Sequence, residues 1–438
     1  MFFGRVVGQD AMPAGAPPVM RIAIVGAGPS GLAVAIALMR RLPQSFEAWM
    51  IDAEDAPGAF AEGAGGAALM AEPARDLSVL PDRPDDFARW LGDDLIARGV
   101  ASLRGPQDLH VPRSLFRAYL MKRFSEALAM RRDVRIRTVR DAVRHIGSAV
   151  TGGVRIGFHE AESAVFDHVF VATGFGLIHR EATSWQEARE AAGRLAAMEN
   201  PPPLTLAGNG PRLAAVLLDL RARGFAGEIR VAAALGGLPH PHGRGPDGAV
   251  FGQPPATRSL KDAFRYIRRE CSDAATREGG QWQAVVDAAS ARLGVVWHNL
   301  PPAARNRYRR HLLPLHRHFS IRIARDVHRR LAAEIAAGRT VLVPFREGLV
   351  KSENTVDCRE IPAARALAGM LGCDSAALFA DECGHLLSGG TPLPGLSAIG
   401  AVASGPRPGP FTFAETVRQA YRSVLALPSR RPTRAFGG

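Results

Sequence analysis

A glycine-rich turn near the start of the chain constrains its fold more than any other feature. Residues 22–38 read IAIVGAGPSGLAVAIAL, so an apolar, β-branched run ends in Gly26, Gly28 and Gly31 and leads directly into an apolar helix. This GxGxxG spacing allows a tight turn, a close approach of backbone N–H groups to a pyrophosphate, and close packing of the helix on the strand. The motif predicts a βαβ unit that binds a dinucleotide.

The residues around this turn support the same interpretation. Pro29 and Ser30 open the helix, whose N-terminal partial positive charge would face the phosphates. A second strand-like run, residues 46–51, ends in Asp52 and Ala53. An acid about twenty residues after the third glycine is placed to accept hydrogen bonds from a ribose hydroxyl. We take these residues as candidate cofactor contacts, with a glycine-rich turn of some other α/β fold as the alternative.

A later element favours FAD over NAD as the first cofactor. Residues 166–171 form a short apolar run that ends in Ala172, Thr173 and Gly174. Flavoproteins with two dinucleotide sites carry such an element after a late strand of the FAD domain, where small residues let the chain turn back beside the cofactor. We therefore add Thr173 and Gly174 to the candidate FAD contacts.

Length and composition limit the class of protein. The 438 residues suit two or three domains, and 47% hydrophobic with 22% charged residues predicts packed cores. The net charge of +13 raises the question of nucleic acid. However, the chain has only the lysines Lys122, Lys261 and Lys351, and its arginines are spread along the sequence. We therefore expect anionic cofactors and a small-molecule substrate, and no nucleic acid.

Cysteine usage and hydropathy address the compartment. The four cysteines form no CxxC pair, so neither a zinc site nor a disulfide framework is expected, and a reducing cytoplasm is the simple interpretation. Residues 1–20 lack a long apolar core of a secretory signal, and no run of about 18 apolar residues predicts a membrane helix. The oligomeric state is left open.

A second strand, turn and helix repeat the first unit in weaker form. An apolar run over 204–207 is followed by Gly208, Asn209 and Gly210, and Leu213 stands where the third glycine would be. Two such units favour one site for FAD and one for NAD(P)H. The alternative is a decayed βαβ unit with a structural role only.

The end of the next strand keeps that alternative open. An NADPH site usually presents an arginine there and an NADH site often an acid, but this chain has Ala233, Ala234 and Leu235. Arg212 and Arg230 lie close in sequence and could substitute. The choice between NADPH and NADH therefore stays open.

These motifs predict an α/β protein with two Rossmann-like domains, the FAD domain being discontinuous, and a helical insertion. The expected divisions of the chain, in order, are a loose N-terminus 1–20, the first part of the FAD domain 21–200, an NAD(P)-binding-like domain 201–258, a helical insertion 259–340, and a return to the FAD domain with a closing helix 341–430.

Several longer segments resemble bacterial FAD/NAD(P)-binding flavoproteins that are distantly similar to N-hydroxylating and Baeyer–Villiger monooxygenases. The resemblance covers about residues 21–425 and rests on the first glycine turn, on PARDLSVLPDRPDDFARWL at 73–91, on VPRSLFRAYL at 111–120, on the Ala-Thr-Gly element and on residues 280–312. It implies that NAD(P)H reduces FAD and that the reduced flavin and O₂ then hydroxylate a heteroatom such as an amine nitrogen.

The resemblance also implies further contacts. Arg113 is a candidate for the pyrophosphate or adenosine side of FAD, and Gly400, Phe411 and Thr412 for the flavin ring, because the last helix of this architecture starts there. His316 and His318 are candidates for the substrate side. No catalytic residue and no metal ligand is assigned.

The chain departs from the family pattern in ways that keep other functions open. The loop 59–71 is rich in alanine and glycine and has Ala71 where an asparagine is expected, and the second site lacks its arginines. An oxidase or dehydrogenase reduced directly by its own substrate is one alternative to a monooxygenase. A non-redox FAD-binding protein is the other.

Overall fold

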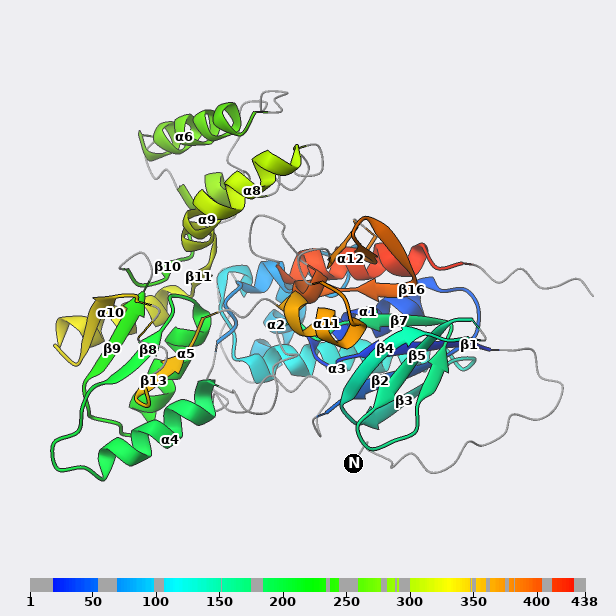
Figure 1. The fold of residues 1–438 in the computed structure, drawn as a ribbon, viewed down its shortest axis with the longest axis horizontal. Helices are drawn as coiled ribbons and strands as arrows, with labels where there is room; N and C mark the ends of the chain where they lie inside the picture. Colours follow the sequence, from blue (N-terminus) through cyan, green and yellow to red (C-terminus); the bar gives the residue numbers. More distant parts are fainter. Residues whose placement is uncertain are drawn as a thin grey trace, which may run out of the picture.

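The computed structural model describes most of the chain, and the statements below concern those residues (Figure 1). The described residues are 19–53, 69–97, 106–150, 152–174, 184–233, 237–243, 259–276, 282–287, 290, 300–346, 348, 352–359, 363–374, 378–381, 383–403 and 412–428.

A seven-stranded sheet forms the centre of the first unit, in the order β14-β15-β16-β7-β1-β2-β3. From β16 to β3 the neighbouring strands are parallel, and β14 and β15 add an antiparallel edge. The strands are β1 (Met20–Val25), β2 (Phe46–Asp52), β3 (Arg135–Arg140), β7 (His168–Val171), β14 (Leu378–Ala380), β15 (His385–Ser388) and β16 (Thr391–Ala398). Their apolar runs are buried because both faces of the sheet are covered.

Helices cover one face of this sheet and a smaller sheet covers the other (Figure 1). The first layer holds α1 (Pro29–Arg41), α2 (Asp86–Ala97), α3 (Arg113–Ala129) and α12 (Phe413–Leu425), with the 3₁₀ turns η2 (Ala74–Asp76) and η3 (Pro106–Asp108). The second layer holds the antiparallel strands β4 (Val143–Ser148), β5 (Val154–Phe158) and β6 (Ala164–Phe166), with α11 (Ala363–Leu371) and the 3₁₀ turn η5 (Gly400–Ala403).

A second, four-stranded parallel sheet has the order β12-β9-β8-β13. Its strands are β8 (Leu204–Ala207), β9 (Ile229–Ala233), β12 (Thr340–Pro344) and β13 (Thr355–Asp357). The helices α4 (Ser184–Ala196), α5 (Pro211–Ala222) and α10 (Arg325–Ala336) contribute buried side chains to a core of its own. In Figure 1 this unit lies to one side of the first.

The remaining helices project from the second unit (Figure 1). They are α6 (Leu260–Thr276), α8 (Pro302–His311) and α9 (Leu313–Ser320), and a two-stranded pair, β10 (His240–Pro241) with β11 (Arg322–Ile323), lies at their base. A small cluster around Leu300 and Tyr308 is the core of this part. Arginine-rich helices with so few buried apolar side chains depend on that cluster for their packing.

The predicted fold class, two Rossmann-like units with an interrupted first sheet, is confirmed, but two boundaries differ. We expected residues 341–350 to return to the first sheet, whereas β12 and β13 pair with β9 and β8 of the second. We also placed residues up to 200 in the first unit, whereas α4 packs in the second core. A short β-branched run carries no signal for which of two parallel sheets it will join. None of the described helices is long and apolar enough to cross a membrane.

Candidate cofactor-binding site

The first glycine turn, between β1 and α1, leaves no room for a side chain at two of its glycines. Gly26 has φ +102°, and a Cβ there would lie 2.7 Å from the carbonyl oxygen of Ala172. A Cβ on Gly31 would lie 1.9 Å from the carbonyl oxygen of Gly26. A Cβ on Gly28 would meet no described heavy atom within 4 Å. The turn is closed at both ends by backbone packing and open in its middle, where we predict the pyrophosphate.

The other predicted FAD contacts gather beside this turn. Pro29 and Ser30 form the first turn of α1, and Gly400 approaches so closely that its Cβ would lie 2.6 Å from Ser30 Oγ. The hydroxyl oxygen of Thr173 is buried and has no hydrogen-bond partner among the described residues. Next to it, Gly174 has φ +60° and open space around it. A buried, unpaired hydroxyl beside open glycines fits a polar ligand.

Asp52, at the end of β2, has a use within the protein that the sequence did not indicate. Its Oδ2 accepts a hydrogen bond of 2.7 Å from the backbone N–H of Ala27 in the glycine turn. The neighbouring Gly26 N–H donates to the carbonyl oxygen of Ile51 at 2.7 Å. The carboxylate therefore helps to hold the turn, while Ala53 follows it, partly exposed. A contact from Asp52 to a ribose stays a prediction.

The start of α12 is capped by the protein itself. The side chain of Thr412 accepts from the N–H of Glu415 at 3.2 Å, and the Glu415 carboxylate accepts from the N–H of Thr412 at 3.1 Å. The next free N–H, that of Phe413, donates to Glu72 Oε1 at 2.7 Å. Phe411 lies outside the described residues. The helix start that we expected to face a flavin ring thus holds a carboxylate from the segment before η2.

That carboxylate, Glu72, is a site residue that sequence reasoning missed. Burial raises its pKa, the bond from Phe413 opposes the shift, and the nearby Asp76 and Glu415 add to it, so that the pKa is about 7. A group with this pKa exchanges a proton near neutral pH, which suits proton transfer. A single glutamate after an alanine-rich loop has no spacing that would single it out. Of that loop, residues 59–68 lie outside the described part of the chain.

The second glycine turn, between β8 and α5, packs against other parts of its unit. Gly208 has φ +142°, and a Cβ there would lie 3.0 Å from the carbonyl oxygen of Cys358, just after β13. Gly210 precedes α5, and Leu213, in the place of a third glycine, is fully buried. The side-chain amide of Asn209 lies 3.2 Å from His318 Nδ1. Strand β13 and helix α9 therefore shape this turn.

Two arginines from different units meet near this second turn. Arg212 belongs to the first turn of α5, and Arg113 opens α3 in the first unit. Burial lowers the pKa of Arg113, and the positive charge of Arg212 lowers it further. No ion pair joins either guanidinium to a carboxylate within the described residues; the Arg212 guanidinium only approaches the carbonyl oxygen of Arg359, at 3.5 Å. Two guanidinium groups without an ion pair among the described residues, near the N-terminus of α5, are suited to binding an anion.

The predicted contact of Arg113 with FAD is therefore open to a second interpretation, because Arg113 lies near Arg212 of the other unit. Ala233 is buried at the end of β9 and pairs with Pro344, so it offers no charged group to a ribose phosphate. Ala234 and Leu235 lie outside the described residues. Arg230 instead pairs with Glu228 at 2.8 Å on the exposed side of the strand.

Aromatic side chains extend the second turn toward α9. His318 Nε2 lies 3.2 Å from His240 Nε2. The His240 ring stacks on Phe319 with centroids 5.2 Å apart and meets Trp282 edge-on at 5.2 Å. Burial lowers the pKa of both histidines, and each lies near other charges or rings. Neutral imidazoles and aromatic rings together form an apolar wall with hydrogen-bonding nitrogens.

A second pair of histidines lies where the two units meet. The rings of His110 and His242 have centroids 5.0 Å apart, and His110 Nδ1 lies 3.1 Å from the carbonyl oxygen of Met70. Burial and the neighbouring His110 lower the pKa of His242 to about 3. Its Nε2 is buried and has no partner among the described residues. This nitrogen is available to a ligand between the units.

The two histidines predicted for the substrate side lie in different surroundings. His318 is part of the aromatic wall at the second turn. His316 instead approaches the hydroxyls of Tyr308 and Ser290, the latter at 2.6 Å. Burial lowers the pKa of His316 to about 4. We interpret it as a residue that joins α8 and α9, because its hydrogen bonds are made within that part.

Comparison with known proteins agrees with this geometry. Residues 23–176 match the model of a family described as FAD-NAD(P)-binding. The matched residues lie in the first unit. The match contains the first glycine turn, Asp52, Arg113, Thr173 and Gly174, and it confirms the predicted relationship to dinucleotide-binding flavoproteins. No curated protein matches the sequence.

Solved structures share the fold at low sequence identity. The cadaverine monooxygenase of desferrioxamine biosynthesis from Erwinia amylovora, solved with FAD, has a TM-score of 0.53 and 12% identity, over 93% of this chain and 94% of its own. The ornithine N-hydroxylase of Kutzneria has a TM-score of 0.49 and 14% identity, over 93% and 98%. The ornithine hydroxylase of Pseudomonas aeruginosa has 0.47 and 14%, over 93% and 98%. The first of these extends the shared fold to both units.

Proposed function

We propose that this chain is an FAD-dependent oxidoreductase that accepts hydride from NADPH or NADH and oxygenates a heteroatom, such as an amine nitrogen, of a small molecule. The observation that carries the proposal is the presence of two glycine turns, each beside polar groups that form no ion pair within the described residues. These groups are the hydroxyl of Thr173 at the first turn and the guanidinium groups of Arg113 and Arg212 at the second.

Each turn has a stated task in this proposal. Gly28, Ser30 and Thr173 would hold the diphosphate of FAD, which supplies the redox chemistry when bound. Gly210, Arg113 and Arg212 would hold the diphosphate of the nicotinamide dinucleotide. The aromatic wall around His240 would exclude water on the substrate side. The protein's part in such a reaction is to bind, orient and shield, so we assign no nucleophile and no metal to the reaction.

Glu72 is our candidate for proton transfer. A carboxyl group with a pKa of about 7 can exchange a proton under working conditions, and it lies at the helix start where the resemblance implies a flavin ring. We place the reaction in the cytoplasm, where the free thiols of Cys358, Cys373 and Cys383 would stay reduced.

The test is an anaerobic titration of the FAD-loaded protein with NADPH and with NADH, following the absorbance of oxidised flavin. Bleaching within the time of mixing supports a working second site. Turnover with O₂ and a panel of amines then separates a monooxygenase from a simple NAD(P)H oxidase. Protein that binds no FAD when purified in its excess would contradict the proposal at its first step.

One observation favours a second candidate, a flavoprotein that is reduced directly by its own substrate. The strand end that usually selects the nicotinamide dinucleotide carries buried Ala233, and Asn209 is bonded to His318. In that case neither NADPH nor NADH bleaches bound flavin, whereas a substrate does. Flavin that is bleached by neither route would favour a non-redox FAD-binding protein.

A further inference from the structure

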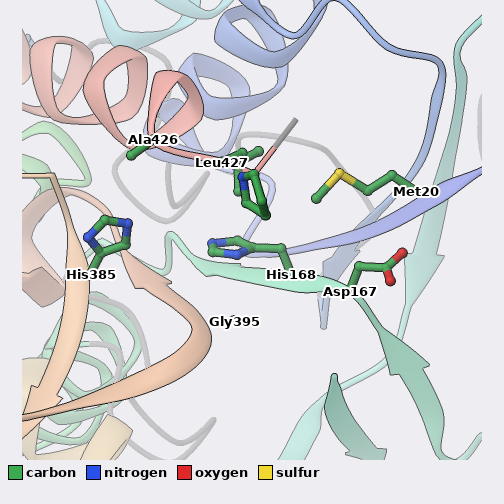
Figure 2. A pocket seen from close by; sticks show the side chains of 8 residues that line it. Met20, Asp167, His168, His385, Gly395, Ala426 and Leu427 are labelled. Carbon is green, nitrogen blue, oxygen red and sulfur yellow. The ribbon is translucent and has the colours of Figure 1, made fainter. Parts of the chain in front are cut away.

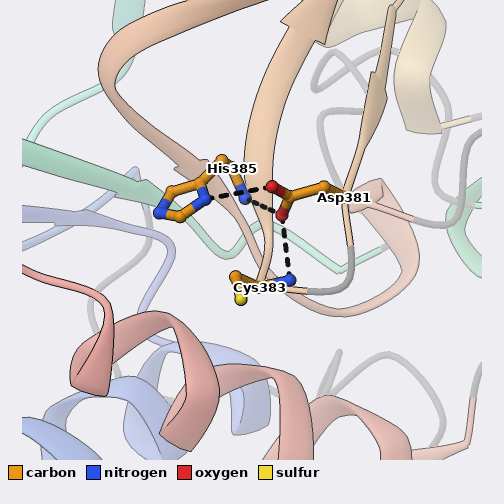
Figure 3. A group of neighbouring side chains, drawn as sticks. All are labelled: Asp381, Cys383 and His385. Atoms are coloured by element: carbon orange, nitrogen blue, oxygen red, sulfur yellow. Dashed lines mark hydrogen bonds and ion pairs between the residues drawn. The ribbon is translucent and has the colours of Figure 1, made fainter.

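The turn between β14 and β15, which is neither of the two glycine turns, brings three different metal-binding side chains together (Figure 3). They are Asp381, Cys383 and His385, which alternate along five residues. A carboxylate oxygen, the thiol sulfur and a ring nitrogen all lie within 4.8 Å of one another. Within the described part of the chain, this is the one group of three such residues that meets this distance.

Hydrogen bonds fix the backbone of this turn around Asp381. Its Oδ1 accepts from the N–H groups of Cys383 and His385, both at 2.9 Å. Its Oδ2 lies 3.1 Å from His385 Nδ1. These bonds give Asp381 and His385 a structural role that requires no metal ion. They give no role to the thiol of Cys383, which nonetheless lies beside the other two groups (Figure 3).

Packing on the neighbouring strand leaves the turn little freedom. Gly384 has φ +80°, and a Cβ there would lie 3.1 Å from the carbonyl oxygen of Ala398 and 3.0 Å from Ile399 Cδ1. The N–H of Ala398 donates to the carbonyl oxygen of Gly384 at 2.8 Å. These contacts hold the backbone at Gly384, between Cys383 and His385, before any ion binds, which lowers the entropic cost of binding.

A cavity of about 320 Å³ lies on the other side of His385 (Figure 2). His168 lines the cavity together with His385, and Figure 2 shows the two rings facing each other. His168 is buried, with its Nε2 lying 3.0 Å from Ser397 Oγ. His385 therefore borders both the cluster and the cavity.

We propose that Asp381, Cys383 and His385 bind one Zn²⁺ through a carboxylate oxygen, the thiolate sulfur and imidazole Nδ1, with water as the fourth ligand. Sulfur, nitrogen and oxygen together suit zinc, whereas Mg²⁺ and Ca²⁺ prefer oxygen alone. Ligand atoms of a tetrahedral zinc site lie about 3.5 Å apart, so the observed spread needs a contraction of about 1 Å. On binding, the Cys383 thiol releases its proton to solvent, and the neutral His385 ring carries its proton on Nε2, which leaves Nδ1 free to bind the ion in place of its contact with Asp381.

This site could not be predicted from spacing, because Asp-x-Cys-x-His matches none of the usual zinc-binding patterns. The turn itself brings the three residues together, because the N–H of Gly384 donates to the carbonyl oxygen of Asp381 at 3.0 Å and the Asp381 side chain accepts from the N–H groups of Cys383 and His385. The proposal does not depend on the proposed redox function, because the ion would bind between β14 and β15 and not at either glycine turn.

The test uses the full-length, FAD-loaded protein, freed of metal by a chelator and titrated with Co²⁺ as a spectroscopic probe. A cysteine-bound cobalt ion gives a sulfur-to-metal charge-transfer band in the near ultraviolet, which bound histidines elsewhere do not produce. We expect this band to saturate at one Co²⁺ per chain and to disappear when Zn²⁺ is added.

Two cysteine variants decide the outcome. Cys383→Ser should abolish the band and weaken Zn²⁺ binding about 100-fold, the share of one ligand among several. Cys373→Ser, at another partly exposed free cysteine, should leave both unchanged. His385→Gln gives a second loss of binding if the first variant is unstable, with the flavin spectrum as a check on folding. A band that survives Cys383→Ser, or no band in the parent protein, overturns the proposal.

Discussion

The two glycine turns show two ways of building the same motif. The first is closed by its own strand and helix, because a Cβ on Gly31 would overlap the backbone of Gly26. The second has Leu213 in the third position and is shaped by contacts with Cys358 and His318, which lie far away in sequence. At its third position the first turn is encoded locally, although Ala172 limits Gly26 as Cys358 limits Gly208, whereas the second turn depends on tertiary contacts throughout. Substitutions at matched positions should therefore have unequal effects.

The largest effect should come from Gly31→Ala. The new Cβ would lie 1.9 Å from a backbone oxygen that cannot move without opening the turn. We expect a loss of about 3 kcal/mol or more in the free energy of unfolding, together with loss of FAD, as for severe overpacking. Thermal and denaturant unfolding would measure it. The control is Gly193→Ala, within helix α4, where a Cβ meets no described atom; a similar loss there would remove the distinction.

The next largest effect distinguishes the binding of FAD from the binding of NAD(P)H. Gly28→Ala and Gly210→Ala both place a methyl group in open space or ordinary contact, at φ −72° and −110°, so neither should change stability by more than about 0.5 kcal/mol. We expect Gly28→Ala to weaken FAD binding about 30-fold, because the methyl group would displace a phosphate. Gly210→Ala should leave FAD bound and raise the KM for NAD(P)H. Equal effects of both variants on FAD would contradict this assignment.

Removing a cation from the second turn should have a smaller effect. We expect Arg212→Gln to weaken NADPH and NADH equally, about tenfold, because loss of one charge-assisted hydrogen bond to a diphosphate costs about 1.4 kcal/mol. Stopped-flow reduction of the flavin would measure both dissociation constants. Arg230→Gln, which removes an exposed arginine already paired with Glu228, is the matched control. A loss of affinity for NADPH alone would indicate that Arg212 contacts the phosphate on the ribose instead of the diphosphate.

The smallest effect is a pH dependence of the free energy of unfolding, which we expect from Glu72 in the first unit. The pKa of Glu72 is raised from 4.5 to about 7, so folding favours the protonated carboxyl and its ionisation destabilises the protein as pH rises through that range. The free energy of unfolding of Glu72→Gln should equal that of the parent near pH 4.5 and exceed it by about 1 kcal/mol near pH 8. This figure is reduced because the side chain is partly exposed. Unfolding at both pH values measures this. An equal change in the free energy of unfolding at both pH values would assign the effect to packing.

The same contrast explains what the sequence could predict. Gly26, Gly31 and Asp52 act within one βαβ unit, so spacing alone located them. Thr173 and Gly400 needed the family pattern, because the strands before them join the sheet from far along the chain. Glu72 depends on a contact with the distant helix α12 of the same unit, and the approach of Arg113 to Arg212 depends on a contact between units; no spacing records either. The placement of β12 in the second sheet has the same cause, since pairing partners of parallel strands are not local.

The interruption of the first sheet has a consequence for folding during synthesis. Strand β7 pairs with β16, but β16 is synthesised only after the whole second unit, from α4 to β13. The second unit's own strands span a continuous stretch and can pair as soon as they leave the ribosome. We therefore expect nascent chains to carry a finished second unit while the first still lacks an inner strand, with FAD loading as a late event that follows release.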